Sequence, residues 1–243
     1  MLNDNYIQGF RIDLDRIPKD SYIRKIEALK DIKEFKFDKP ITFFVGENGT
    51  GKSTLIEAIA KSYGFNAEGG TKNYYFKTYD DTSDLANYLT IYKGPKKSNY
   101  NYFFRAETFY NVATKEIEYS ETLNPKYKDK FHEKSHGESF LHLFQKLNDA
   151  KGVFLLDEPE AALSPQKQLT LFSIIHEASK KGSQFIIISH SPILLALSNA
   201  DIYEFSDKGI NKQEYEDTLS YKVISNFIKH RKIMIEELTK DND

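Results

Sequence analysis

Residues 41–54 have the sequence Ile41-Thr-Phe-Phe-Val-Gly-Glu-Asn-Gly-Thr-Gly-Lys-Ser-Thr54. The first five residues are apolar or β-branched, which predicts a buried strand over 41–45. A loop with three glycines follows, and the residues from Leu55 to Ile59 are mostly apolar at helical spacing, which predicts a helix. A strand, a glycine-rich loop and a helix in this order form the context of a phosphate-binding loop.

The loop fits the pattern G-x-x-x-x-G-K-[ST], with Gly46, Gly51, Lys52 and Ser53 at the required positions. Glycines let backbone N–H groups approach phosphate oxygens, and the start of the helix adds its positive end. Lys52 is expected to reach the β- and γ-phosphates of a nucleotide, and the Ser53 hydroxyl to hold Mg²⁺. The residues expected to bind the nucleotide here are Glu47, Asn48, Gly49, Thr50, Gly51, Lys52, Ser53 and Thr54.

Composition limits the class of protein. A chain of 243 residues can form one large domain or two small ones, and 40% hydrophobic residues indicate a globular fold. The absence of cysteine excludes disulfide scaffolds, thiolate zinc sites and cysteine nucleophiles, and it fits a cytoplasmic protein. We expect no signal peptide and no membrane span, because no suitable apolar run is present. A net charge of −2 gives no overall attraction to nucleic acid.

Strands and helices alternate along the chain, which predicts an α/β fold with a mostly parallel sheet and helices on both faces. Strands are expected at 7–12, 32–37, 41–45, 73–78, 88–92, 101–105, 153–156, 185–188 and 202–205. A short helix is expected around 22–29, and a cap at Ser164-Pro165 predicts a helix that Gly182 ends. Residues 107–150 are lysine-rich and helical in character, and the tail from Leu219 to Ile228 predicts an amphipathic helix packed on the body.

Two further apolar strands end in polar residues. Val153-Phe-Leu-Leu-Asp-Glu-Pro159 ends in two acids, and ligands bind at the carboxyl ends of parallel strands. Asp157 is expected to hold Mg²⁺ opposite Ser53, and Glu158 to deprotonate the water that attacks the γ-phosphate. His190 follows the strand 185–188 and is expected to contact the γ-phosphate. Taken singly, the two acids could belong to an ordinary solvated turn, and the histidine could be an ordinary loop residue. Because they lie downstream of a phosphate loop, a role in nucleotide chemistry is favoured.

A phosphate loop, a strand followed by Asp-Glu-Pro, and a strand followed by Ser-His, in this order, resemble the ABC-type ATPases. The segment Asp157-Glu-Pro-Glu-Ala-Ala-Leu-Ser-Pro165 is similar to the RecF/SMC/OLD-like branch, and especially to small stand-alone bacterial ATPases. The resemblance implies a P-loop NTPase fold in one domain over 1–243, with an antiparallel N-terminal sheet and a helical signature lobe at 107–150. It also implies ATP and Mg²⁺ as ligands and catalytic roles for Glu158, His190 and Lys52.

The resemblance also implies an ATP-dependent homodimer with two ATP molecules between its subunits. Lys134-Ser-His-Gly-Glu138 corresponds to the signature segment, although His136 replaces a glycine, and Ser135 and Gly137 would contact the γ-phosphate bound by the other subunit. Arg11 and Tyr22 correspond to a basic residue near the nucleotide and to an adenine-stacking residue. Glu107 corresponds to the region of the glutamine loop and is a further candidate metal ligand, although glutamine itself is absent.

Two motifs point elsewhere. His132-Glu-Lys-Ser-His136 matches the zinc-protease pattern H-E-x-x-H, but Gly137 weakens a helix through it and Ser139 stands where the longer pattern requires glycine. Asn211-Lys-Gln-Glu214 resembles a guanine-binding motif with the wrong acid, and we interpret it as a loop after a hairpin turn at 207–209.

The sequence therefore predicts an ATPase that dimerises around ATP and drives or gates a protein or DNA partner that it does not identify. One alternative is a weakly hydrolysing, nucleotide-gated module of a DNA-repair or phage-defence complex. Another is the ATPase subunit of a transporter whose membrane part is a separate chain, which the segment 160–165 and the imperfect signature disfavour.

Overall fold

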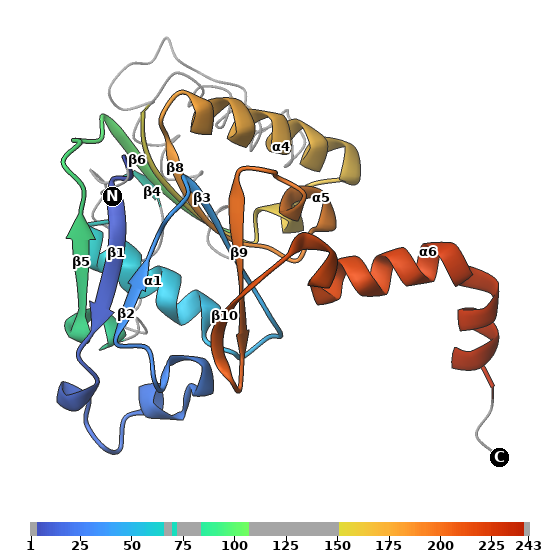
Figure 1. Ribbon diagram of the computed structural model, residues 1–243, viewed down its shortest axis with the longest axis horizontal. Coiled ribbons are helices and arrows are strands. Elements are labelled where there is room, and N and C mark those ends of the chain that lie inside the picture. Colours follow the sequence, from blue (N-terminus) through green and yellow to red (C-terminus); the bar gives the residue numbers. More distant parts are fainter. Residues whose placement is uncertain (1–3, 66–69, 72–83, 107–150, 241–243) are drawn as a thin grey trace, which may run out of the picture.

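The structure, a computed structural model, describes residues 4–65, 70–71, 84–106 and 151–240. Within these residues, the centre of the molecule is a seven-stranded sheet of order β10-β9-β3-β8-β7-β6-β4 (Figure 1). The strands from β9 to β6 are parallel, and β10 and β4 are antiparallel edge strands. Their bounds are β3 Ile41–Val45, β4 Gly70–Thr71, β6 Tyr100–Arg105, β7 Gly152–Asp157, β8 Gln184–Ile188, β9 Ala200–Ser206 and β10 Gly209–Gln213. The predicted α/β fold with a mostly parallel sheet is confirmed.

A smaller antiparallel sheet of order β2-β1-β5 contains β1 (Ile7–Ile12), β2 (Glu34–Lys36) and β5 (Leu89–Lys93). This arrangement confirms the antiparallel N-terminal sheet. The short helix expected over 22–29 is instead two 3-10 helices, η2 (Tyr22–Lys25) and η3 (Glu27–Leu29), because the chain is extended at Ile26 between them. The short 3-10 helices on this side are η1 Leu14–Arg16, η2 Tyr22–Lys25, η3 Glu27–Leu29 and η4 Asp84–Tyr88.

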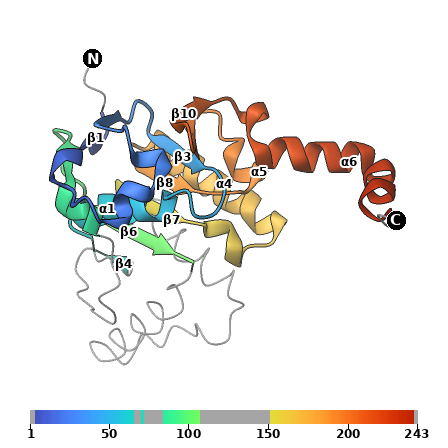
Figure 2. The same cartoon turned by 90° about the horizontal axis from the view of Figure 1, so that it is seen from below.

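Helices cover both faces of the main sheet (Figures 1 and 2). Successive side chains of a strand point to opposite faces, so Phe44 of β3 packs in the core with α1 (Lys52–Tyr63), whereas Phe43 packs with α4 (Pro165–Lys180). The short helix α5 (Pro192–Leu195) also contributes to this second core. Both phenylalanines are fully buried, and β3 with its following loop is therefore held from two sides.

Helix α4 begins and ends as the sequence predicts. The Ser164 hydroxyl accepts a hydrogen bond from the backbone N–H of Lys167, and Pro165 occupies the first turn. The helix ends at Lys180, and Gly182 has a φ of 101°, a left-handed conformation that glycine adopts without strain.

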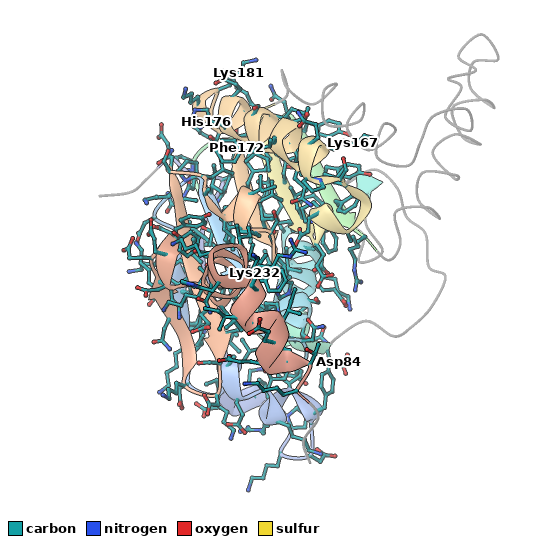
Figure 3. The ribbon with its side chains drawn as sticks, turned by 90° about the vertical axis from the view of Figure 1, so that its right-hand side faces the viewer. Asp84, Lys167, Phe172, His176, Lys181 and Lys232 are labelled. Carbon is teal, nitrogen blue, oxygen red and sulfur yellow. The ribbon has the colours of Figure 1, made fainter. Side chains whose placement is uncertain are left out.

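The C-terminal helix α6 (Leu219–Leu238) forms as expected, but the prediction that it packs on the body is wrong within the described residues. None of its side chains is buried, and Ile228 is 72% exposed. Figure 1 shows α6 extending away from the sheet, and Figure 3 looks along it towards the body, with Lys232 labelled. Amphipathic spacing predicts a helix with an apolar face, but it does not determine what contacts that face.

Two more features concern this end of the chain. The turn at 207–209 joins β9 to β10 as a hairpin, as expected. Residues 211–213, however, belong to strand β10 and pair with β9, so their interpretation as a loop is wrong. The pairing partner β9 comes from outside the motif, and the motif alone therefore could not indicate it. No helix in the described part of the chain has the length and apolar composition required to cross a membrane.

Candidate functional site

The phosphate loop lies between β3 and α1 and owes its shape to three glycines. Gly46, Gly49 and Gly51 have φ values of 130°, 81° and 94°, which other residues rarely adopt. A Cβ atom on Gly46 would lie 2.4 Å from the carbonyl oxygen of Phe205, and one on Gly51 would lie 2.4 Å from Ile26 Cγ2. Helix α1 begins directly after Gly51, so its first N–H groups face the loop. This loop has the conformation and surroundings required of an anion-binding turn.

Lys52 curves back over the loop. Its Nζ atom donates hydrogen bonds to the carbonyl oxygens of Gly46 at 2.7 Å and Glu47 at 2.6 Å. The residue is only 5% exposed. Burial lowers the pKa of Lys52 below its ordinary value of 10.5, and the nearby carboxylates, first that of Glu158 and then that of Asp157, act in the opposite direction. The loop therefore holds a partly desolvated ammonium group at the point where a phosphate would enter.

Ser53 and Asp157 come together as the sequence predicts. The Ser53 hydroxyl lies 3.4 Å from Asp157 Oδ1, although the two residues are 104 positions apart. Mg²⁺ prefers hard oxygen ligands and usually takes only one or two from the protein, the rest being water and phosphate oxygens. The hydroxyl and carboxylate present here fit that ion. Among the described residues, no cluster of three or more His, Cys, Asp or Glu side chains could bind a metal by itself.

Glu158 and His190 face each other at the ends of β7 and β8. His190 Nε2 lies 4.0 Å from Glu158 Oε1, and both side chains are partly exposed. Glu158 has φ 52° and ψ 53°, the only left-handed backbone outside glycine in the described residues. A non-glycine residue in this conformation is strained, and such strain occurs most often at functional sites. Its backbone N–H donates to the carbonyl oxygen of Ile188 at 3.0 Å, which fixes the turn against β8.

Glu160 is a residue that the sequence analysis did not assign to the site. Its Oε1 atom accepts a hydrogen bond from the backbone N–H of His190 at 2.5 Å, so it ties the turn after β7 to the turn after β8. Burial raises the pKa of the Glu160 carboxyl above its ordinary value of 4.5, while hydrogen bonds from His190 and Ser189 oppose that rise. The position of Glu160, two residues after Glu158, was the indication in the sequence that it belongs to the site.

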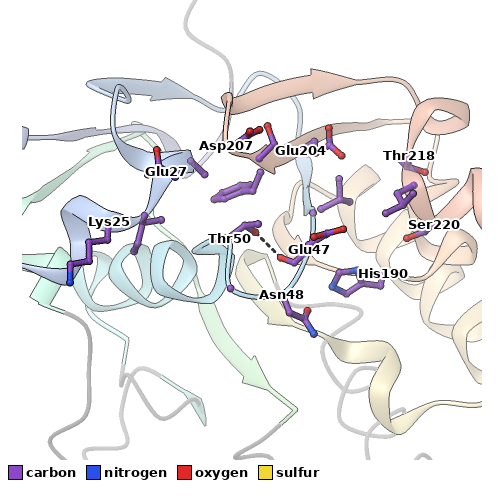
Figure 4. A pocket seen from close by; sticks show the side chains of 18 of the residues that line it. Lys25, Glu27, Glu47, Asn48, Thr50, His190, Glu204, Asp207, Thr218 and Ser220 are labelled. Carbon is purple, nitrogen blue, oxygen red and sulfur yellow. Dashed lines mark hydrogen bonds between the residues drawn. The ribbon is translucent and has the colours of Figure 1, made fainter.

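A cavity of about 1220 Å³ opens beside the loop. It is lined by loop residues 46–50, by His190, by the β9–β10 hairpin and by the start of α6 (Figure 4). Tyr22 of η2 is half-exposed and lines the same cavity, so it lies where a base bound beside the loop could reach it. Arg11 lies on β1, is exposed and is not among the lining residues. The roles of Tyr22 and Arg11 stay predictions.

Several predicted site residues lie outside the described residues. These are Glu107, Ser135 and Gly137; the disfavoured zinc-protease pattern with His132 and His136 lies outside the described residues as well. The predicted signature lobe at 107–150 is also outside them, and the roles of these residues stay predictions.

Arg105 is a second residue that the sequence analysis missed. It ends β6, which pairs with β7 so that Arg105 lies opposite Asp157. Its Nη1 atom lies 3.3 Å from Glu57 Oε2, and its Nε atom lies 3.8 Å from Asp157 Oδ2. The indication in the sequence was a charged residue at the end of a predicted strand, as for Asp157.

Comparison with known proteins assigns the family. The AAA domain family (AAA_23) matches residues 21–242, and the chain belongs to it. A putative ABC transporter ATP-binding protein of Methanosarcina acetivorans is 30% identical over 201 residues, which cover 70% of each chain. The chain is an ABC-type ATPase. The family match confirms the resemblance to the ABC-type ATPases of the RecF/SMC-like branch.

Other proteins are similar to this ATPase at lower identity. The phosphate import ATP-binding protein PstB 1 of Vibrio vulnificus is 27% identical over 223 residues, covering 78% of this chain and 82% of the relative. The SMC head domain from Thermotoga maritima is 15% identical with a TM-score of 0.49, covering 86% of this chain and 99% of that one. An ATP-binding cassette of an ABC transporter in its ADP conformation is 21% identical with a TM-score of 0.46, and the match covers 86% of this chain and 92% of that one.

Proposed function

We propose that this ATPase binds and hydrolyses Mg-ATP at the carboxyl edge of β3, β7 and β8, and that it dimerises around ATP to drive or gate a partner. One observation carries the proposal: Ser53, which follows the phosphate loop, lies 3.4 Å from Asp157, and Glu158 of the same turn lies 4.0 Å from His190. Residues distant in sequence thus supply a phosphate cradle, two oxygen ligands and an acid–base pair at one edge.

In this proposal Lys52 and the loop N–H groups stabilise charge on the β- and γ-phosphates. Ser53 and Asp157 hold Mg²⁺, which supplies further charge neutralisation when bound. Glu158 accepts a proton from the attacking water, and His190 orients that water against the γ-phosphate. The new bond joins the water oxygen to the γ-phosphorus, and the bond to the β–γ bridging oxygen breaks, giving ADP and phosphate.

The second subunit completes the site in trans through Ser135 and Gly137. ATP binding therefore closes the dimer and hydrolysis opens it, and the movement is passed to a partner protein or to DNA. We expect this cycle to take place in the cytoplasm, because the chain has no cysteine and is compatible with a reducing compartment.

The test is Glu158→Gln, which keeps the size of the side chain and removes the base. The variant should retain ATP and accumulate as a dimer on gel filtration, while phosphate release falls about 10²–10⁴-fold. Glu177→Gln, in an exposed pair with Lys180 on α4, is the matched control and should behave as wild type. Unchanged turnover in Glu158→Gln would remove Glu158 from this role.

A second candidate function is the ATPase subunit of a transporter with a separate membrane chain. The names of two relatives favour it, since one is a phosphate import protein and the other a putative ABC transporter ATP-binding protein. Affinity purification of the Glu158→Gln variant with ATP separates the two candidates. Recovery of a membrane protein supports a transporter, and recovery of a water-soluble protein or of DNA supports the first proposal.

A further inference from the structure

We propose that Arg105 is a positioning residue for the magnesium ligand Asp157. In this role its guanidinium group bridges Asp157 to Glu57 of α1 and turns one carboxylate oxygen of Asp157 towards Ser53. The inference rests on the proposed function, because it assumes that Ser53 and Asp157 hold Mg²⁺.

The sheet brings Arg105 to this position. β6 and β7 are parallel neighbours, and the pairing sets Arg105 opposite Asp157 at the last residue of each strand. The Arg105 side chain is 18% exposed, and the side chains of Asp157 and Glu57 are 10% and 9% exposed. Three charged groups therefore lie together in a place that water reaches poorly.

The two oxygens of Asp157 have different neighbours. Oδ1 lies 3.4 Å from the Ser53 hydroxyl, and Oδ2 lies 3.8 Å from Arg105 Nε. At 3.8 Å the contact with Oδ2 is an ion pair and not a hydrogen bond, and its attraction favours the carboxylate orientation that leaves Oδ1 on the side of the phosphate loop. Groups of this kind, which orient a metal ligand without touching the metal, typically contribute 10–100-fold to metal affinity.

Glu57 holds the other end of the guanidinium group. It lies on α1, five residues after Lys52, and its Oε2 atom is 3.3 Å from Arg105 Nη1. A guanidinium group is planar and carries five N–H donors in fixed directions, so it can bind two carboxylates at once. The ammonium group of lysine is a point charge on a flexible stem and cannot fix two partners in the same way. Arginine at position 105 thus connects the helix that follows the phosphate loop to the acid at the end of β7.

The experiment measures ATP affinity with Mg²⁺ and with EDTA, in the Glu158→Gln background so that ATP is not consumed. Calorimetric titration gives the gain in affinity that Mg²⁺ provides. Adding Arg105→Gln should reduce this gain about tenfold or more, and leave the affinity in EDTA within about twofold. Glu57→Gln should reduce the gain by a smaller factor, because it removes only the anchor of Arg105. Arg231→Gln, on the exposed helix α6, is the matched control.

Arg105→Lys keeps the positive charge and provides a second test if Arg105→Gln fails to fold. Thermal unfolding of each variant shows whether it is folded. If Arg105 positions Asp157 by bridging it to Glu57, Arg105→Lys should keep only part of the gain in ATP affinity that Mg²⁺ provides. Full recovery by lysine would overturn the positioning role, because charge alone would then suffice. An equal loss of affinity in EDTA would also overturn it, since Arg105 would then bind the nucleotide directly. If the Glu158→Gln parent binds ATP equally with and without Mg²⁺, the proposed magnesium site itself fails.

Discussion

The turn after β3 and the turn after β7 lie at the same edge of one sheet, but they are built differently. The turn after β3 takes its shape from three glycines with positive φ and presents backbone N–H groups. The turn after β7 holds Glu158 in a left-handed conformation without glycine and presents carboxylates. In the proposed function, the first turn binds an anion through its main chain, and the second acts on the phosphate through its side chains.

Because of this difference, the two turns should respond in opposite ways to changes of the backbone and of the side chains. The phosphate loop should tolerate changes of exposed side chains that are not proposed to bind phosphate or Mg²⁺, but not an added Cβ atom at Gly46 or Gly51, where it would lie 2.4 Å from a neighbouring atom. The acidic turn should tolerate, and even gain from, relief of backbone strain, but it should lose function when the carboxylate of Asp157 or Glu158 is removed.

Lys52→Ala should have the largest effect, because Lys52 is the one side chain of the phosphate loop predicted to contact the transferred phosphate. Phosphate release should fall at least about 100-fold, the usual cost of losing a group that stabilises transition-state charge. Lys180→Ala on α4 is the control, since that lysine lies in an exposed pair. Retained turnover in Lys52→Ala would show that the main chain of the loop suffices alone.

Gly46→Ala should destabilise the fold by about 2–3 kcal/mol, because it adds strain at a positive φ and a contact with the backbone of Phe205. Gly49→Ala is the matched control: its φ is 81°, but no atom lies within 4 Å of the added Cβ, so we expect about 1 kcal/mol. Urea denaturation measures both free energies of unfolding. Equal costs would show that conformation alone, and not close packing against β9, restricts the loop.

Glu158→Gly should remove the base and relieve the left-handed strain in one step. We expect the free energy of unfolding to rise by about 0.5–1 kcal/mol, because the relief of strain exceeds the entropy that glycine adds to the unfolded chain. Urea denaturation beside Glu158→Gln separates the backbone effect from loss of the charge. A fall in stability would mean that the contacts of the Glu158 side chain outweigh the strain.

Glu160→Gln should have the smallest effect at neutral pH, within about 1 kcal/mol, since the amide oxygen can still accept the bond from the His190 N–H. Its effect should depend on pH. Burial raises the pKa of Glu160 in the folded protein. The contribution of this residue to the free energy of unfolding is therefore complete below pH 4.5, and part of it is lost as the pH rises through the raised pKa. The free energy of unfolding of wild type, relative to that of Glu160→Gln, should therefore be higher at pH 4.5 than at pH 7.5. A pH-independent difference would contradict this reasoning.

Much of the site could be predicted from residues that are neighbours in sequence. The phosphate loop, Asp157 with Glu158, and His190 each follow an apolar strand, and parallel strands bring their carboxyl ends to one edge. Arg105 and Glu160 were missed because their partners are supplied by other strands and helices. Arg105 contacts Glu57, which is 48 residues away, and Glu160 contacts His190, which is 30 residues away.

The sequence by itself determined the local conformations: where glycine permits a phosphate loop, where α4 is capped, and which strands are buried. These depend on interactions between residues a few positions apart. Only the tertiary structure decided which charges meet at the sheet edge, that residues 211–213 join β9, and that α6 extends away from the body. Those outcomes depend on which surfaces the sheet brings together, and a pattern along one segment contains no information about the partner that another segment provides.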